Sequence, residues 1–319
     1  MSATPPMSMI STDSDFAEAI THLFFAITAV DVGILVLVVV LVALAVFKYS
    51  RRDEGLGTEV PHERQFKLEV AWTVGPALIL AVVGTISVRM TFKTQAPVPP
   101  GDSLEVDVTG QQWWWDVRYP SLGVTTANEI HVPTGQRIRF RLRSRDVVHS
   151  FWVPRLGGKR DLIPGQTNDL AFVANTPGAY PGECSEFCGT SHANMRFMVF
   201  VQTPEDFERW VADQSGPPRV AARPDVPAGL VLAGAQAYAA SSCTPCHTIG
   251  PVSRGTFGPN LTHFASRTTF AGGTVENTPE NVEAWIRNPA ALKPGAKMPA
   301  LGVSEPQVKQ LVAYLESLE

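Results

Sequence analysis

The chain has 319 residues and a formal net charge of −4, so it is long enough for two compact domains and gives no sign of nucleic-acid binding. Its four cysteines fall in two short paired motifs, which leaves none for a structural disulfide. Seven tryptophans and a mean hydropathy of +0.04, in a chain with 26 prolines, indicate a membrane part joined to a polar part.

The N-terminal part predicts a helical membrane hairpin. Residues 1–22 are polar and contain no Lys or Arg, which argues against a conventional signal peptide with its basic start. Two apolar runs follow, at about 24–47 and 70–90, and each is long enough to span a bilayer. We therefore expect an outer segment at 1–22 and a transmembrane hairpin at 23–93 in contact with lipid.

Basic residues between the two apolar runs predict the orientation of the hairpin. Such residues favour the cytoplasmic side of a membrane. The N-terminus and everything beyond the second span would then lie on the periplasmic, outer side of a bacterial cell membrane. The basic residues are Lys48, Arg51, Arg52, Arg64 and Lys67.

Two carboxylates lie in or next to these spans. Asp31 falls inside the first span, where an ionisable side chain is costly and is a functional candidate by default. It lies near the outer end of that span, so a position at the interface is an equal alternative. Glu69 opens the second span, and from the residues alone it is a carboxylate at the inner membrane surface.

Residues 94–214 predict an antiparallel β-sandwich outside the membrane. SLEVDVT and QRIRFRLRS alternate apolar and charged residues with a period of two, as strands with one solvated face do. MRFMVFVQ is another such segment, and several short strands between Gly/Pro turns are typical of a sandwich. In QQWWWD, three adjacent tryptophans cannot all face the core. At least one ring should mark a contact site, with packing against the membrane surface or another subunit as the alternative.

The stretch PGECSEFCGTSHANM contains four soft metal ligands. Cys184, Cys188, His192 and Met195 supply thiolates, an imidazole and a thioether, which suit copper far better than magnesium or calcium. A mononuclear blue-copper site needs one Cys, whereas two thiolates can bridge two copper ions. Each copper ion then needs its own imidazole, and His149 in DVVHSFWVP is the best candidate for the second. A disulfide or two buried thiols is the alternative.

Beyond a Pro/Gly/Ala-rich tether at 215–229, residues 230–319 contain a haem-attachment motif. In SCTPCHTI, the CxxCH pattern predicts thioether bonds from Cys243 and Cys246 to haem vinyl groups, with His247 as an axial ligand. A CxxC pair could also form a redox or zinc motif. The adjoining histidine and the expected outward location favour haem.

The sixth ligand of that haem is argued by exclusion. Met298 in AKMPA is the only methionine after position 198, and a Met/His pair is one of the axial ligand sets of c-type cytochromes. His263 is the alternative, as the only other histidine in this part besides His247. TPENVEAWIRNP and SEPQVKQLVAYLESL predict capped helices that begin after Thr278 and Ser304.

HSFWVP, LGGKRDLIPG and PGECSEFCGTSHANM resemble subunit II of the haem-copper cytochrome c oxidases, with its dinuclear CuA centre. Together with the CxxCH part, the chain resembles the caa(3)-type members, which carry a fused cytochrome c. The resemblance implies a multidomain fold: a two-helix transmembrane hairpin, a cupredoxin-like sandwich and a small all-α class I cytochrome c domain. It implies that copper is bound by His149, Cys184, Glu186 through its backbone carbonyl, Cys188, His192 and Met195.

The resemblance also implies roles for several other residues. Trp113 matches the aromatic residue at which electrons enter CuA, and Trp114 stands where tyrosine is common. The Glu186 side chain resembles a magnesium ligand at the interface with the catalytic subunit, and Glu69 resembles the entrance of a proton pathway. GPNL at 258–261 matches the segment whose Pro carbonyl accepts a hydrogen bond from the haem-ligating histidine.

The implied function is electron relay in a respiratory oxidase. An external donor (a cytochrome, a copper protein or an upstream respiratory complex) would reduce the haem c, and the electron would pass to CuA and then to a haem in subunit I. Oxygen would be reduced to water there, coupled to proton pumping, with subunit III as a further partner. The alternatives are the electron-entry subunit of a CuA-containing nitric oxide reductase and a membrane-tethered electron carrier.

Overall fold

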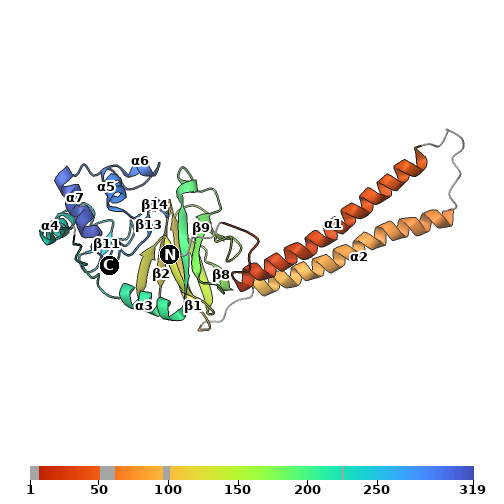
Figure 1. Ribbon diagram of the computed structural model, residues 1–319, viewed down its shortest axis with the longest axis horizontal. Helices are drawn as coiled ribbons and strands as arrows, with labels where there is room; N and C mark the ends of the chain where they lie inside the picture. The colour runs from red at the N-terminus through yellow and green to blue at the C-terminus, as the bar shows by residue number, and fades with distance from the viewer. Residues whose placement is uncertain (1–6, 51–61, 96–100, 225) are drawn as a thin grey trace. The chain divides into compact units, whose positions relative to one another are not determined.

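The computed structural model describes residues 7–50, 62–95, 101–224 and 226–319 (Figure 1). The chain divides into two compact units, one with residues 18–97 and the other with residues 1–17 and 98–319. Each unit is described by itself below.

The first unit consists of two long helices, α1 (Asp15–Tyr49) and α2 (His62–Thr94), drawn in red and orange in Figure 1. Both are long and apolar enough to cross a membrane, and no residue of their most apolar windows is buried. A helix that is apolar all round needs an apolar environment. The two expected spans are therefore confirmed as helices. α1 begins at Asp15, well before the apolar run, and Arg51 and Arg52 lie outside the described residues.

The segment that precedes α1 belongs to the second unit. Ser14 forms an antiparallel bridge with Ala174, at the end of strand β8 (Asn168–Val173). The Asp15 carboxylate accepts a hydrogen bond from the Val173 N–H at 2.8 Å and pairs with Arg137 at 2.9 Å. Ser14, just before the first helix, and Asp15, its first residue, are thus bonded to the domain that follows the second helix.

The second unit contains a sandwich of two five-stranded sheets. Across the first sheet the order is β3 (Val124–Ala127), β2 (Trp114–Tyr119), β1 (Leu104–Gln111), β5 (Arg137–Ser144) and β8. Across the second it is β4 (Glu129–Pro133), β10 (Arg196–Gln202), β9 (Gly178–Cys184), β6 (His149–Trp152) and β7 (Arg160–Leu162).

The alternating residues of β1 and β5 form the expected buried and solvated faces. Val106, Val108, Ile138 and Phe140 are fully buried in the core between the sheets. Charged partners pair on the outer face, as between Glu105 and the Arg139 guanidinium at 3.2 Å. The sandwich fold is confirmed, but its sheets are mixed, because β1 pairs with β5 in parallel and β4 pairs with β10 in parallel.

The C-terminal part of this unit is mainly helical. Helix α3 (Pro204–Gln214) follows the sandwich, and four further helices and two short hairpins come after it. These are α4 (Ala228–Ala239), β11 (Thr248–Ile249) with β12 (Ser253–Arg254), β13 (Thr269–Phe270) with β14 (Val275–Glu276), α5 (Pro279–Arg287), α6 (Pro289–Leu292) and α7 (Glu305–Leu315).

Helices α4 and α7 pack closely because α4 carries glycine at the contact. A Cβ on Gly234 would lie 2.0 Å from the Gln310 carbonyl oxygen, closer than any real side chain could approach. The expected helix starts are also present: Thr278 accepts a hydrogen bond from the Asn281 N–H at 3.3 Å, and Ser304 begins α7 with a capping box.

The stretch that joins the sandwich to the helical part is fastened along part of its length. Arg219 and Glu319 exchange two backbone hydrogen bonds, at 2.7 and 3.0 Å, and the Ala221 N–H donates to the Ser317 carbonyl at 2.8 Å. The sequence predicts a semi-extended tether over 215–229. Its composition could not reveal this strand-like pairing, because the partner residues lie about 100 positions later in the chain.

Candidate metal and haem sites

The predicted copper ligands lie on the second sheet and on the loop that leaves it. Cys184 ends β9, His149 begins β6, and these two strands are hydrogen-bonded neighbours. The loop runs from Cys184 through the short 3-10 helix η1 (His192–Asn194) to β10, which pairs with β9 along almost its whole length. The sandwich therefore holds both ends of the loop in place.

All six predicted copper donors gather around the two thiols. The Sγ atoms of Cys184 and Cys188 are 3.8 Å apart, which is far longer than a disulfide bond and is close enough for both to bind the same ions. The other contacts are His149 Nδ1 to Cys184 Sγ at 3.9 Å, Glu186 O to Cys184 Sγ at 3.3 Å, His192 Nδ1 to Cys188 Sγ at 3.5 Å and Met195 Sδ to Cys188 Sγ at 3.9 Å.

The chemistry of this donor set fits a pair of copper ions. Two sulfurs lie between two imidazoles that face them through the same ring nitrogen, and a thioether and a carbonyl complete the group. Cys184, Cys188, His149 and Met195 are each at most 5% exposed, so water has little access. Soft thiolate, imidazole and thioether ligands of this kind favour copper over hard cations.

The interaction between the two thiols shifts the pKa values of Cys184 and Cys188 in opposite directions. The Cys188 side chain and the His149 ring stabilise the Cys184 thiolate and lower its pKa to about 3, although burial opposes this. The resulting negative charge, with burial, raises the pKa of Cys188. Burial lowers the pKa of His149, but the bonds to Cys184 and Asp146 outweigh it and leave this pKa raised. Of the two thiols, Cys184 is therefore the one whose negative charge the surrounding groups favour.

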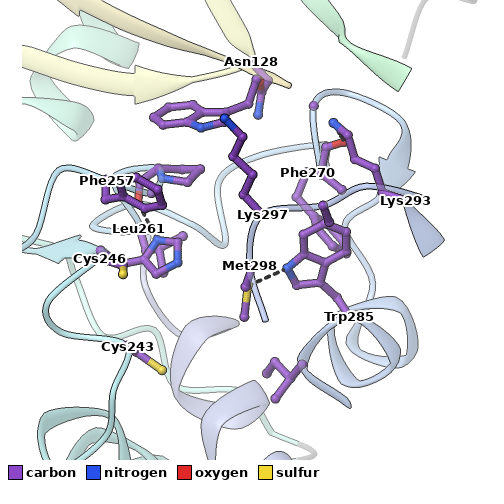
Figure 2. A pocket seen from close by; sticks show the side chains of 18 of the residues that line it. Asn128, Cys243, Cys246, Phe257, Leu261, Phe270, Trp285, Lys293, Lys297 and Met298 are labelled. Carbon is purple, nitrogen blue, oxygen red and sulfur yellow. Dashed lines mark hydrogen bonds between the residues drawn. The ribbon is translucent and has the colours of Figure 1, made fainter. Parts of the chain in front are cut away.

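A cavity of about 690 Å³ lies between the helical part and one end of the sandwich. Ligand sites usually occupy about 300–1,000 Å³, so this volume suits a large cofactor. Cys243, Cys246, His247 and Met298 all line it, and Figure 2 shows the two cysteines on one loop and Met298 on another. His263 is not among the lining residues; its Nε2 lies 3.1 Å from the Gly216 carbonyl oxygen.

The His247 ring is oriented by its neighbours as an iron ligand would be. Its Nδ1 bonds the Pro259 carbonyl at 2.8 Å, which leaves Nε2 for a metal. A Cβ on Gly258 would lie 2.5 Å from the ring, so only glycine leaves room there. Burial lowers the pKa of His247 and keeps the imidazole neutral. In the same cavity, the Met298 sulfur accepts a hydrogen bond from Trp285 Nε1–H at 3.1 Å (Figure 2). These residues fit a c-type haem.

Comparison with known proteins connects both sites to one family. Three family models match: the transmembrane domain of cytochrome c oxidase subunit II over residues 4–90, its periplasmic domain over 122–202 and cytochrome c over 231–319. Cytochrome c oxidase subunit 2 of Alkalihalophilus pseudofirmus is 36% identical over 294 residues, which are 90% of this chain and 83% of that protein. The chain belongs to the cytochrome c oxidase subunit II family.

A further relative and a solved structure are also similar to this chain. Cytochrome c oxidase subunit 2 of Bacillus sp. strain PS3 is 32% identical and is matched over 84% of this chain and 80% of that protein. The solved periplasmic domain of cytochrome oxidase subunit II of Bradyrhizobium japonicum is 33% identical, with 37% of this chain and 96% of that chain covered and a TM-score of 0.35. This subunit II with its fused cytochrome c domain is therefore part of an oxidoreductase complex, and the two families imply CuA and haem c.

In this subunit II, Trp113 joins the two sites. Its Nε1–H donates to the Cys188 carbonyl at 3.0 Å, and the same residue lines the haem cavity. Gln112 supports the contact by donating to the same carbonyl at 2.8 Å. Trp115 is fully buried in the sandwich core, whereas Trp114 is partly exposed and also lines the cavity. The expectation that not all three rings face the core is confirmed.

The remaining predicted residues lie apart from these clusters. The Glu186 side chain is exposed, although its carbonyl reaches the thiols, and Glu69 and Asp31 are exposed on α2 and α1. Among the residues that the structure describes, the group of three or more acidic, His or Cys side chains with metal-ligand geometry is that of His149 and the two copper-loop cysteines. The magnesium and proton-pathway roles stay predictions.

Sequence reasoning missed Asp146, which orients the predicted copper ligand His149. Its Oδ1 lies 2.8 Å from His149 Nε2, and its Oδ2 accepts a hydrogen bond from the Gln112 N–H at 2.8 Å. Burial raises the pKa of Asp146, but these bonds outweigh it and lower the pKa overall. A carboxylate three residues before a predicted histidine ligand was the available sign, because such groups commonly fix the ring of a metal-binding histidine.

Proposed function

We propose that this subunit takes electrons from an external donor through its own haem c and delivers them by way of dinuclear CuA to the haem of subunit I, for reduction of oxygen to water coupled to proton pumping. When bound, the haem and the copper pair supply the one-electron carriers. The protein's own part is to bind these groups, hold their ligands rigid and keep water away.

The proposed ligands are those that surround each site. The haem would be bonded to Cys243 and Cys246, with His247 and Met298 as axial ligands. Met298 is preferred to His263 because only Met298 lines the cavity. The copper pair would take His149, Cys184, the Glu186 carbonyl, Cys188, His192 and Met195.

One observation supports the direct relay most strongly: Trp113 belongs to both sites. Its indole is hydrogen-bonded to the backbone of the copper-binding Cys188, and the residue also forms part of the haem cavity wall. Electron transfer between two centres becomes faster as the distance between them falls. A single side chain that contacts the copper loop and the haem cavity provides the short connection that the relay needs.

Rigid ligands also support electron transfer as the function of the copper loop. A carrier works fastest when its ligands move little between oxidation states. Here strands β6 and β9 fix His149 and Cys184, and Asp146 fixes the outer nitrogen of the histidine ring.

We further propose that two parts of the second unit lie on the periplasmic side of a bacterial inner membrane. They are the copper part, which is the sandwich with its copper loop and α3, and the cytochrome part, which runs from α4 to the C-terminus. The bridge between Ser14 and Ala174 fastens the chain before α1 to the domain that follows α2. A hairpin whose two ends connect to one domain has both ends on the same face of a bilayer. The basic loop then lies on the opposite face, which the positive-inside rule identifies as cytoplasmic.

Three finer roles complete the proposal. The exposed Glu186 carboxylate would share a magnesium ion with subunit I, and Glu69 would lie at the entrance of a proton pathway. Subunits I and III would contact the hairpin, since none of the residues of α2 is buried within this chain.

The experiment that tests this function uses the oxidase complex purified with this subunit. We expect two coppers of the CuA type and one haem c per chain, an electron spin resonance pattern from one electron shared by two coppers, and oxygen consumption with a reduced external donor. Trp113→Phe should slow reduction of the copper by the haem while both spectra remain unchanged. One copper per chain would contradict the dinuclear centre, and consumption of nitric oxide but not oxygen would identify a nitric oxide reductase.

A chain that purifies alone, with both cofactors but with no large membrane partner, would instead be a tethered electron carrier. That outcome would contradict delivery to subunit I and would leave the ligand assignments intact.

A further inference from the structure

The cytochrome part contacts the copper part through backbone at a turn with two glycines. Gly272 and Gly273 have φ values of +77° and +71°. A Cβ on Gly272 would lie 2.7 Å from the Trp113 carbonyl oxygen, and a Cβ on Gly273 would lie 2.9 Å from the Arg196 carbonyl oxygen. The Arg196 N–H also donates to the Gly272 carbonyl at 2.7 Å. No side chain separates the two parts at this point.

Lys293 lies beside this turn and is only 3% exposed. Its Nζ donates to the Trp113 carbonyl of the copper part at 2.5 Å and to the Ala271 carbonyl of its own part at 2.9 Å. Within the described residues it forms no salt bridge. Burying an ammonium group away from water is costly unless hydrogen bonds compensate for the lost hydration. The compensation here comes from two carbonyls, one from each part.

A purely local role does not account for these contacts. If Lys293 only stabilised its own loop, it would need no partner outside the cytochrome part, yet its shorter hydrogen bond is to Trp113. Burial lowers the pKa of Lys293 to about 7. Either protonation state can make both bonds, because a neutral amine still carries two N–H donors.

A second contact holds the two parts together independently. Glu129 of strand β4 is 2% exposed, and its Oε1 accepts hydrogen bonds from the backbone N–H groups of Thr268 and Thr269, at 2.8 and 3.0 Å, and from the Thr268 hydroxyl at 2.6 Å. Loss of Lys293 would leave this contact in place. It would therefore change how the cytochrome part sits on Trp113 without detaching it.

We propose that Lys293 is a positioning residue for electron transfer: by donating to both the Trp113 and the Ala271 carbonyls, it fixes the cytochrome part against Trp113, the residue that is hydrogen-bonded to the copper loop. This inference rests on the proposed relay through Trp113. Lys293 is not a ligand and touches no reacting atom, so its effect appears in the rate between the two centres and not in the centres themselves.

The test compares Lys293→Met with Lys309→Met in the intact oxidase complex. Lys309 is exposed on α7, so the control makes the same chemical change away from the contact. Two quantities are measured: the rate of electron equilibration between haem and copper after flash reduction, and hydrogen exchange at two amides that cross the contact. The Arg196 amide reports the glycine turn, and the Thr269 amide reports the Glu129 contact.

In Lys293→Met we expect both electron equilibration to slow and Arg196 exchange to speed up by at least about tenfold, which corresponds to the loss of one hydrogen bond of about 1.4 kcal/mol. Thr269 exchange and both cofactor spectra should not change, and Lys309→Met should match the wild type. Lys293→Gln, which keeps N–H donors on a shorter side chain, should give an intermediate result and replaces the methionine variant if that variant does not accumulate.

Two results would overturn the positioning role. One is an unchanged equilibration rate with unchanged protection of Arg196. The other is equal loss of protection at Arg196 and Thr269 with altered haem absorption, which would indicate a general structural role. Failure of the proposed function would look different, because the wild-type complex would itself show no electron transfer from haem to copper.

Discussion

The copper loop and the haem cavity occupy one compact unit, but they depend on their cofactors in different ways. The copper donors sit at the end of a sandwich whose core is already filled, with Trp115 packed against His149, Phe151 and Phe197. The cytochrome part has a smaller core, and several of its buried residues, among them Tyr238, Phe264 and Leu311, also line the cavity. The sandwich can therefore pack its core without copper, whereas the cytochrome part needs haem to fill the space between its helices.

The largest expected effect comes from preventing haem attachment. In Cys243→Ser combined with Cys246→Ser, the cytochrome part should lose its cooperative unfolding transition while the sandwich keeps its own. An empty cavity of about 690 Å³ would leave the surrounding helices without the contacts that haem provides, and the stability of a whole domain is only about 5–15 kcal/mol. The measurement is amide hydrogen exchange, which compares the protection of helices α4 and α7 of the cytochrome part with that of strands β1 and β5 of the sandwich. Equal protection of α4 and α7 with and without haem would contradict the comparison.

Removing a copper ligand should have a much smaller effect on folding. Cys188→Ser should abolish the shared-electron spectrum, yet shift the melting temperature of the sandwich by only a few degrees, because the core around the loop stays packed. Thr190→Ser, an exposed conservative change in the same loop, is the matched control. Copper retained in Cys188→Ser with an unchanged spectrum would show that the centre is not dinuclear.

A single methyl group next to the predicted haem ligand His247 should affect the haem site and leave the copper site unchanged. Gly258→Ala places a Cβ 2.5–3.0 Å from three atoms of the His247 ring, so the ring or the loop must move. We expect a destabilisation of about 1–3 kcal/mol and altered haem absorption, with the copper spectrum unchanged. Gly229→Ala, which meets nothing within 4 Å, is the control in the same part. Wild-type haem absorption in Gly258→Ala would disprove the expected crowding.

The smallest expected effect is acid sensitivity of the sandwich through His131. This ring stacks on Trp210 and Phe200, and burial lowers its pKa to about 4, partly offset by a hydrogen bond to Gln202. The unfolded chain binds the proton more readily, so stability should be lost as pH falls from about 6.5 towards 4.

His131→Phe should remove about 1–2 kcal/mol of this pH dependence, a value reduced for partial exposure of the ring. Thermal melts between pH 7 and 4, followed through the sandwich signal, measure the change. An identical pH slope in the variant would assign the acid sensitivity to other groups.

Features set by neighbouring residues could be predicted from the sequence. The spacing from Cys184 to Met195 is short enough for one loop to gather the donors, and CxxCH defines a haem site within five residues. The alternating residues of β1 and the cap at Thr278 likewise follow from local rules.

Features that depend on distant pairing could not be predicted. The parallel pairing of β1 with β5 is indistinguishable from antiparallel pairing in a period-two pattern. Lys293 looks like any loop lysine until the fold brings it to Trp113, which is 180 residues away. Such contacts are fixed by the packing of whole domains, and no short window of sequence encodes them.

The shared wall of the haem cavity has a consequence for how the cytochrome is studied. Residues of the copper part, among them Gln112, Trp114 and Asn128, line the haem cavity and would shield a bound haem from water. Solvent exposure is one of the factors that set the reduction potential of a haem, since a high dielectric favours the more highly charged oxidised iron. An excised cytochrome domain should therefore show a lower midpoint potential than the same haem in the intact chain. The driving force of the relay is a joint property of both parts.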